Sequence, residues 1–181
     1  LFTPRWIVQY LVENSLGRLW MLNNPKSNLT HQMKYYINPG KFETDFIKIS
    51  SPEEIKICDP ACGSGHMLIY SFDLLYAIYE EEGYSSDSIP SLILSKNLYG
   101  IELDQRAGQL SAFSLTMKAK ERDRNFFEKS IETNICVLEN IKFEKEEFEE
   151  YVIDFGRDLM TNDLKNILKQ FEESNNFGSL I

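Results

Sequence analysis

Residues 58–66, Cys-Asp-Pro-Ala-Cys-Gly-Ser-Gly-His, combine a carboxylate with two closely spaced glycines. Gly63 and Gly65 permit backbone angles that other residues rarely adopt, and they let main-chain amides approach a ligand. No Lys-Ser or Lys-Thr follows them, which excludes a phosphate-clamping Walker loop, and Leu68 stands where a dinucleotide fingerprint would need a third glycine. Asp59 suits a ligand with positive charge, such as an amino group or a sulfonium.

A second carboxylate, Glu102 in the stretch Tyr-Gly-Ile-Glu-Leu-Asp, ends a short apolar run. A carboxylate at a strand end can accept hydrogen bonds from both hydroxyls of a ribose. Each hydrogen bond to a charged acceptor contributes roughly 1.5–3 kcal/mol. Asp59 and Glu102 together predict a site for a small molecule with a ribose and a positive charge; the alternative is a generic turn beside a solvated glutamate.

The cysteines and His66 are the other candidates for chemistry. The sequence has no further cluster of Cys or His that would complete a four-ligand metal site with Cys58 and Cys62. A packing role is therefore preferred to a metal-binding role for both cysteines. The Pro-Cys pair with which cytosine-C5 methyltransferases attack is absent. His66 falls in the first turn of the next helix, where a turn-packing or capping role is preferred to catalysis.

The hydrophobic pattern predicts an α/β fold in which strands and helices alternate. The order strand, helix, strand, helix, strand implies parallel strands with right-handed crossovers. The predicted strands are 55–58, 98–102 and 134–138, and the predicted helices between them are 66–84, 91–97 and 105–124.

Packing expectations follow for each long helix. The aromatic residues of 70–79 are assigned to the core and not to a base-stacking platform. In helix 105–124 small residues are expected to lie against the sheet, while the core is filled by Leu110, Phe113 and Met117. At the N-terminus, Thr3 is expected to cap a helix that begins at Pro4 and ends at Gly17. A second short helix is expected within 28–37.

Composition limits the classes of function. The 181 residues carry 28 acidic and 19 basic side chains, a formal net charge of −9. A protein that grips duplex DNA needs Lys and Arg to displace phosphate counterions. Either the partner is not nucleic acid, or the basic surface lies outside this chain. Three cysteines form no disulfide framework and indicate a cytoplasmic location, and no apolar stretch approaches the roughly 20 residues of a membrane span.

Three motifs resemble those of S-adenosylmethionine-dependent DNA adenine-N6 methyltransferases: Phe-Thr-Pro at 2–4, Asp-Pro-Ala-Cys-Gly-Ser-Gly at 59–65, and the acidic strand end at Glu102. The sequence around these motifs is most similar to that of the adenine methyltransferases of BREX (bacteriophage exclusion) systems. In those proteins, stretches like Val-Glu-Asn-Ser-Leu-Gly-Arg-Leu-Trp and Phe-Gly-Ser-Leu-Ile recur. The resemblance covers nearly the whole chain. It implies a partial Rossmann-like class I methyltransferase fold, with parallel strands and flanking helices.

The resemblance implies a site for S-adenosylmethionine and no metal. The methionine end of the cofactor would lie against Phe2, Thr3 and Pro4. Its methionine and ribose moieties would be lined by Asp59, Pro60, Ala61, Cys62, Gly63 and Gly65. Glu102 would hold the ribose hydroxyls and Leu103 would pack on the adenine ring. Glu139 or Asn140 would lie near the adenine amino group.

The same family needs a further motif, Asn/Asp-Pro-Pro-Tyr/Phe, which binds the target amino group and stacks on the flipped base. The sequence contains no such motif, because Asn24-Pro25 and Asn38-Pro39 lack the second proline and the aromatic residue. In this family the motif follows the cofactor motifs, so we expect it beyond Ile181. The chain is therefore expected to bind cofactor without methylating DNA by itself, and no catalytic residue is assigned in it.

The expected organisation has three parts within a larger protein. Residues 1–50 form an N-terminal helical segment with the F-x-P motif, 51–140 a cofactor-binding Rossmann-like core, and 141–181 an acidic helical extension. The acidic run 143–151 is interpreted as a solvated helix face, with docking to a basic partner as the alternative. DNA is expected to bind regions outside this chain, and other phage-defence proteins are candidate partners. The oligomeric state and the DNA sequence that is read stay open.

Two other classes of function stay open. One is a methyltransferase of RNA, protein or a small molecule, and the other is a non-catalytic module that binds the cofactor as a sensor or assembly partner. The retained Asp59, Gly63 and Glu102 argue against a degenerate pocket. A nucleotide-dependent oxidoreductase is the remaining alternative.

Overall fold

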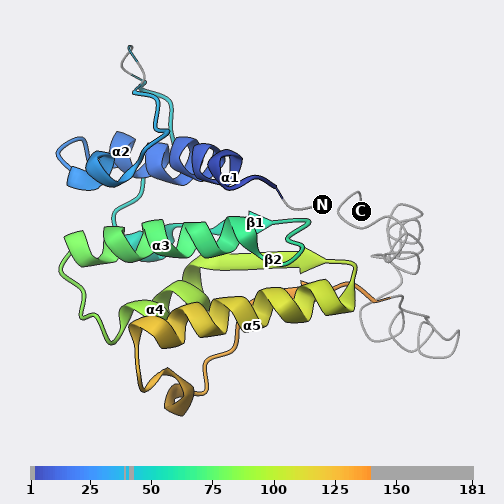
Figure 1. The fold of residues 1–181 in the computed structure, drawn as a ribbon. Helices are drawn as coiled ribbons and strands as arrows, with labels where there is room; N and C mark the ends of the chain where they lie inside the picture. Colours follow the sequence, from blue (N-terminus) through green and yellow to red (C-terminus); the bar gives the residue numbers. More distant parts are fainter. Residues whose placement is uncertain (1–2, 39, 41–42, 140–181) are drawn as a thin grey trace, which may run out of the picture.

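A three-stranded parallel sheet lies at the centre of the fold (Figure 1). The computed structural model describes residues 3–38, 40 and 43–139. The strands are β1 (Ile57–Asp59), β2 (Leu98–Glu102) and β3 (Asn134–Val137), hydrogen-bonded in the order β1-β2-β3. Both pairs are parallel, with Asp59 opposite Gly100 and Glu102 opposite Val137. The prediction of a parallel α/β arrangement with flanking helices is confirmed.

Two long helices pack on one face of the sheet (Figure 1). They are α3 (His66–Glu81), which follows β1, and α5 (Gln105–Arg122), which follows β2. The short α4 (Ile89–Leu92) and the π-helical turn Ile93–Asn97 lead from α3 back into β2. Close packing on this face requires Gly100, where a methyl group would lie 3.0 Å from Leu68 of α3.

The cysteines of the outer strands point to the other face. Cys58 of β1 pairs with Tyr99, and Cys136 of β3 pairs with Ile101, so both lie on the side of the sheet opposite to Gly100. Both are exposed. The expectation that Cys58 packs in the core is therefore wrong, because the strand alternation turns it away from the helices.

The inward stripe of α5 consists of three small residues and one leucine, namely Gly108, Ser111, Leu115 and Ala119. Gly108 is buried, and a methyl group there would lie 2.5 Å from Val137, which confirms that this helix approaches the sheet closely. The three large residues expected in the core are instead exposed, at 48% for Leu110, 62% for Phe113 and 44% for Met117. They lie two positions after the buried stripe Gly108, Ser111 and Leu115, and two positions correspond to about 200° around an α-helix.

The first helical run continues beyond Gly17, where it was expected to end, and its α1 part lies against α3 (Figure 1). It comprises α1 (Arg5–Val12), the π-helical turn Glu13–Gly17 and α2 (Arg18–Asn23). Gly17 does not end the helix, because it adopts helical angles and its missing side chain leaves room for Met33. The short helix expected within 28–37 is confined to the 3-10 turn Asn28–Gln32.

The hydrophobic core centres on the buried faces of α3 and its neighbours. Phe72, Tyr76 and Tyr79 are buried there, so their assignment to the core is confirmed. The largest fully buried side chains elsewhere include Trp20, Leu29, Ile89, Ile93, Leu98 and Phe126. None of the described helices is long and apolar enough to cross a membrane.

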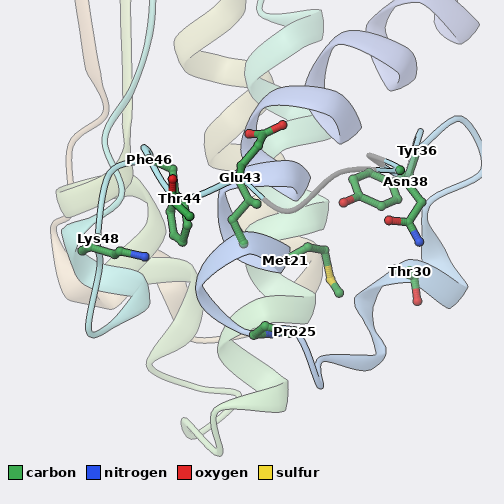
Figure 2. A pocket seen from close by; sticks show the side chains of 11 residues that line it. Met21, Pro25, Thr30, Tyr36, Asn38, Glu43, Thr44, Phe46 and Lys48 are labelled. Carbon is green, nitrogen blue, oxygen red and sulfur yellow. The ribbon is translucent and has the colours of Figure 1, made fainter.

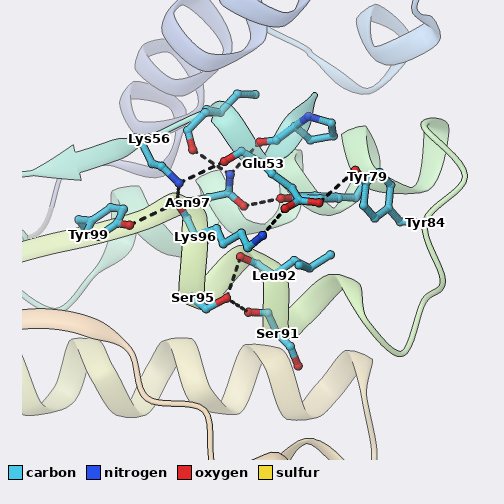
Figure 3. Close-up of polar contacts among 12 residues, drawn as sticks. Glu53, Lys56, Tyr79, Tyr84, Ser91, Leu92, Ser95, Lys96, Asn97 and Tyr99 are labelled. Atoms are coloured by element: carbon cyan, nitrogen blue, oxygen red, sulfur yellow. Dashed lines mark hydrogen bonds and ion pairs between the residues drawn. The ribbon is translucent and has the colours of Figure 1, made fainter. Parts of the chain in front are cut away.

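A polar network holds the amino ends of β1 and β2 together (Figure 3). The buried Asn97 donates to the carbonyls of Pro52 and Ile55 at 2.8 Å each and accepts the hydroxyl of Tyr79 at 2.9 Å. Lys96 forms an ion pair with Glu53 beside it. This network lies at the end of the sheet opposite to Asp59 and Glu102, so it stabilises the strands without entering the candidate site.

Candidate cofactor-binding site

Two acidic side chains stand at the carboxyl edge of the sheet, where ligands of open parallel sheets bind. Asp59 is the last residue of β1 and Glu102 is the last residue of β2. The loop 60–65 that joins β1 to α3 crosses the end of β2, because the amide of Cys62 donates to the carbonyl of Ile101 at 2.9 Å. The structure thus brings both carboxylates and the glycine loop to one place.

Both glycines of the loop adopt left-handed angles, with φ of 53° at Gly63 and 84° at Gly65. Gly65 is the N-cap of α3, and a methyl group there would lie 2.5 Å from the hydroxyl of the buried Ser111. Around Gly63, by contrast, no heavy atom lies within 4 Å of the place a methyl group would take. Gly65 is therefore required by packing, whereas the space beside Gly63 is open to a ligand.

Glu102 is tied to the loop through the backbone. One carboxylate oxygen accepts the amide of Gly63 at 2.5 Å, and the other accepts the amides of Leu103 at 2.9 Å and Asp104 at 3.1 Å. These bonds orient the carboxylate, and the oxygen that faces Gly63 can accept a further hydrogen bond. The group can accordingly accept a ligand hydroxyl.

Asp59 gives the site a second negative charge. One of its carboxylate oxygens accepts the amide of Ala61 at 3.2 Å. Burial raises the pKa of the neighbouring Cys62 thiol, and the charges of Asp59 and Glu102 raise it further. Cys62 is therefore held as a neutral thiol, and the surrounding field favours a positively charged ligand.

The start of α1 lies beside the first turns of α3. Thr3 and Arg5 line one side of a crevice of about 460 Å³, and His66 and Tyr70 of α3 line the other. The N-cap of α1 is Pro4 without a side-chain cap, so the expectation that Thr3 caps the helix is wrong. Thr3 lies at the crevice instead.

The other predicted site residues lie around this edge or beyond the described residues. Leu103 is exposed just after β2, and Glu139 is exposed two residues after β3. The amide of Leu138 donates to the carbonyl of Glu102 at 2.9 Å, which places the end of β3 beside the end of β2. Phe2 and Asn140 lie outside the described residues.

His66 takes the turn role expected of it. It begins α3 and is exposed, and its Nδ1 lies 3.0 Å from the hydroxyl of Ser64 in the loop. Cys62, the loop residue expected to pack, is buried. Among the described residues no three His, Cys, Asp or Glu side chains are grouped so that they could hold a metal ion.

An apolar groove of about 560 Å³ runs along β1 next to the loop. None of the sequence motifs predicted this groove. Asp59 and Pro60 form its end towards the site. Its apolar walls include Val12, Leu16, Leu19, Ile57 and Met67. Among the described residues β1 pairs only with β2, so this groove follows the open edge of the sheet.

A further pocket, of about 600 Å³, lies between α2 and the segment around residues 36–48 (Figure 2). Its lining includes Met21, Tyr36, Glu43 and Phe46. It contains none of the predicted site residues, and it lies away from the carboxyl edge of the sheet. We therefore place the candidate site at Asp59, Glu102 and the loop between β1 and α3.

Comparison with known proteins identifies the family of the chain. The family model described as MmeI, DNA-methyltransferase domain, matches residues 47–143, a range that contains Asp59, the glycine loop and Glu102. The chain is also similar to the adenine-specific methyltransferase BrxX of Escherichia coli O9:H4 (strain HS). The two are 45% identical over 152 residues, which is 80% of this chain and 13% of BrxX.

A second similar protein is the adenine-specific methyltransferase PglX of Lacticaseibacillus casei (strain Zhang). It is 35% identical over 195 residues, an alignment that covers 100% of this chain and 16% of PglX. The chain thus spans less than a fifth of the length of either curated relative.

Proposed function

The chain belongs to the MmeI family of DNA-methyltransferase domains, and we propose that it is the S-adenosylmethionine-binding part of an adenine-specific DNA methyltransferase. The observation that carries the proposal is the contact between Glu102 and Gly63, which joins an acidic strand end to an open glycine loop. The relatives are named adenine-specific methyltransferases.

The residues at the carboxyl edge suit this cofactor. Glu102 would accept the ribose hydroxyls, and the open side of Gly63 lets the backbone approach the ligand. The negative charge of Asp59 matches the positive charges of the methionine amino group and the sulfonium. Thr3 and Pro4 would lie along the methionine end, Leu103 against the adenine ring, and Glu139 near the adenine amino group.

When bound, S-adenosylmethionine supplies a methyl group on a positively charged sulfur. The chain's own residues bind and orient the cofactor, and none of them is proposed to act on the base. The sequence has no Asn/Asp-Pro-Pro-Tyr/Phe motif. We propose that this motif belongs to other parts of a longer protein, as the share of the relatives that the chain covers suggests.

The proposal extends to the architecture and the partners. We assign a Rossmann-like class I arrangement, with residues 1–50 as an N-terminal helical segment, 51–140 as the cofactor-binding core and 141–181 as an acidic extension. The net charge of −9 supports DNA binding by regions outside this chain. A role in phage defence, with other defence proteins as partners in the cytoplasm, follows from the similarity to BrxX and PglX.

Calorimetry on the purified chain tests the proposal. We expect binding of S-adenosylmethionine and S-adenosylhomocysteine and no binding of NAD. Binding of NAD without S-adenosylhomocysteine would overturn the choice of cofactor. Methylation of adenine in DNA by the 181-residue chain alone would contradict the proposal that the catalytic motif lies in other parts of a longer protein.

A further inference from the structure

Glu13 is a fully buried carboxylate in the π-helical turn that follows α1. One of its oxygens accepts the amide of Tyr35 at 2.5 Å, and the other accepts the hydroxyl of Tyr70 at 2.6 Å. Among the described residues no Lys or Arg forms an ion pair with it. A buried carboxylate without a cation is costly, so its hydrogen bonds must hold it in place.

The neighbouring residue completes a clamp on the same segment. Asn14 donates to the carbonyl of Tyr35 at 2.8 Å and accepts the amide of Ile37 at 2.8 Å. Glu13 and Asn14 therefore bind the backbone of residues 35–37, which shields the buried carboxylate. Within the clamp, the contact that reaches the site is the one with Tyr70, because Tyr70 belongs to α3.

The contact between Glu13 and Tyr70 joins the two walls of the crevice beside the glycine loop. Thr3 and Arg5 enter this crevice from the α1 side, and His66 and Tyr70 enter it from α3. Tyr70 lies one helical turn after His66, which directly follows the loop. A shift of α1 against α3 would therefore move Thr3 relative to the loop.

We propose that the hydrogen bond from Tyr70 to Glu13 is a positioning contact for S-adenosylmethionine, which holds Thr3 and Pro4 at the methionine end of the cofactor site. This inference rests on the proposed function. Glu13 does not line the crevice, and Tyr70 acts in this proposal through its hydroxyl, which is bonded to Glu13. Their effect is confined to the end of the ligand that the N-terminal segment meets.

Ligand truncation separates positioning from general stability. S-adenosylhomocysteine carries the amino-acid end, whereas 5′-methylthioadenosine lacks it. For Tyr70→Phe we expect about tenfold weaker binding of S-adenosylhomocysteine, because the bond that holds α1 against α3 is lost and Thr3 and Pro4 are no longer fixed at the methionine end. Binding of 5′-methylthioadenosine should change less than about twofold.

The matched control is Tyr79→Phe on the same helix. The Tyr79 hydroxyl is also buried and bonded, to Asn97, but it lies towards the other end of α3. We expect this variant to lower the melting temperature and to leave the affinity for both ligands unchanged. Glu13→Gln keeps the size of the side chain and one acceptor oxygen but removes the charge, so it should give a smaller selective loss in the same direction as Tyr70→Phe.

The outcomes are distinguishable by calorimetry and thermal melting of the four proteins. If the unmodified chain binds neither ligand, the proposed function fails. If it binds both, and Tyr70→Phe and Glu13→Gln bind S-adenosylhomocysteine normally, only the positioning role is overturned. An equal loss for both ligands would also overturn it, because that result means a general disruption of the site.

Discussion

The carboxylate of Glu102 accepts a hydrogen bond from the backbone amide of Gly63 over 2.5 Å, across 39 positions of sequence. The bond joins the end of β2 to the loop that follows β1. The group proposed to receive the ribose hydroxyls therefore also orients the loop that faces the ligand. Binding and loop geometry depend on the same side chain, which makes Glu102 the most informative position to change.

Replacement of Glu102 by Ala should weaken binding of S-adenosylhomocysteine at least about tenfold, or about 1.4 kcal/mol. The variant loses the ribose acceptor and also releases the amide of Gly63. Calorimetry measures the affinity, with Glu132→Ala as the control, because Glu132 is exposed just before β3, at the opposite end of the sheet. Unchanged affinity in the Glu102 variant would show that the pocket lies elsewhere.

Gly63→Val and Gly83→Val form a matched pair. Both glycines have positive φ, 53° and 81°, and neither has a heavy atom within 4 Å of the place a methyl group would take. Both variants should lose stability by a similar amount, on the order of 1–2 kcal/mol, from the left-handed backbone alone. Only Gly63→Val should also lose ligand affinity, by at least about tenfold, because Gly83 lies at the far end of α3. Equal affinities would argue against a ligand beside Gly63.

The two faces of α5 should respond differently to mutation. Phe113 is 62% exposed, so Phe113→Ser should change the free energy of unfolding by no more than about 0.5 kcal/mol. Leu115 is buried, and Leu115→Ala should cost about 2–5 kcal/mol. Urea denaturation measures both changes. A larger cost at Phe113 than at Leu115 would mean that the helix is rotated from the orientation described.

Asp123 should contribute stability that disappears in acid. The hydrogen bond from Lys129, 2.7 Å away, and then the amide of Asn125 hold the pKa of this carboxyl below its usual value. A lowered pKa in the folded state means that stability is present at neutral pH and is lost as the pH falls through the folded pKa.

Asp123→Asn should therefore be less stable than the unmodified chain at pH 7, with a difference that shrinks as the pH is lowered below about 4. Urea denaturation at a series of pH values measures this difference. A constant difference across the series would mean that the charge of Asp123 plays no part.

The alternation of strands and helices along the chain and the glycine loop were predictable because their signals are local. The alternation of apolar runs and helical periodicity predicts parallel strands at 55–58, 98–102 and 134–138, and each bound lies within two residues of the observed strands Ile57–Asp59, Leu98–Glu102 and Asn134–Val137. The motif at 59–65 needs glycine where the backbone turns into α3, and Gly63 and Gly65 do take left-handed angles. The end of the first helix was misplaced because Gly17 serves close packing and not a turn.

The sequence by itself determined the type of each central element and the positions of Asp59 and Glu102 at strand ends. Only the tertiary structure decided which stripe of α5 meets the sheet, because α5 carries a small-residue stripe and an apolar stripe that could each be buried. Likewise only the folded chain brings Glu13 to Tyr70, 57 positions away. Such pairings depend on how elements pack against one another. The hydrophobic periodicity of one helix or strand does not specify which other element packs against it.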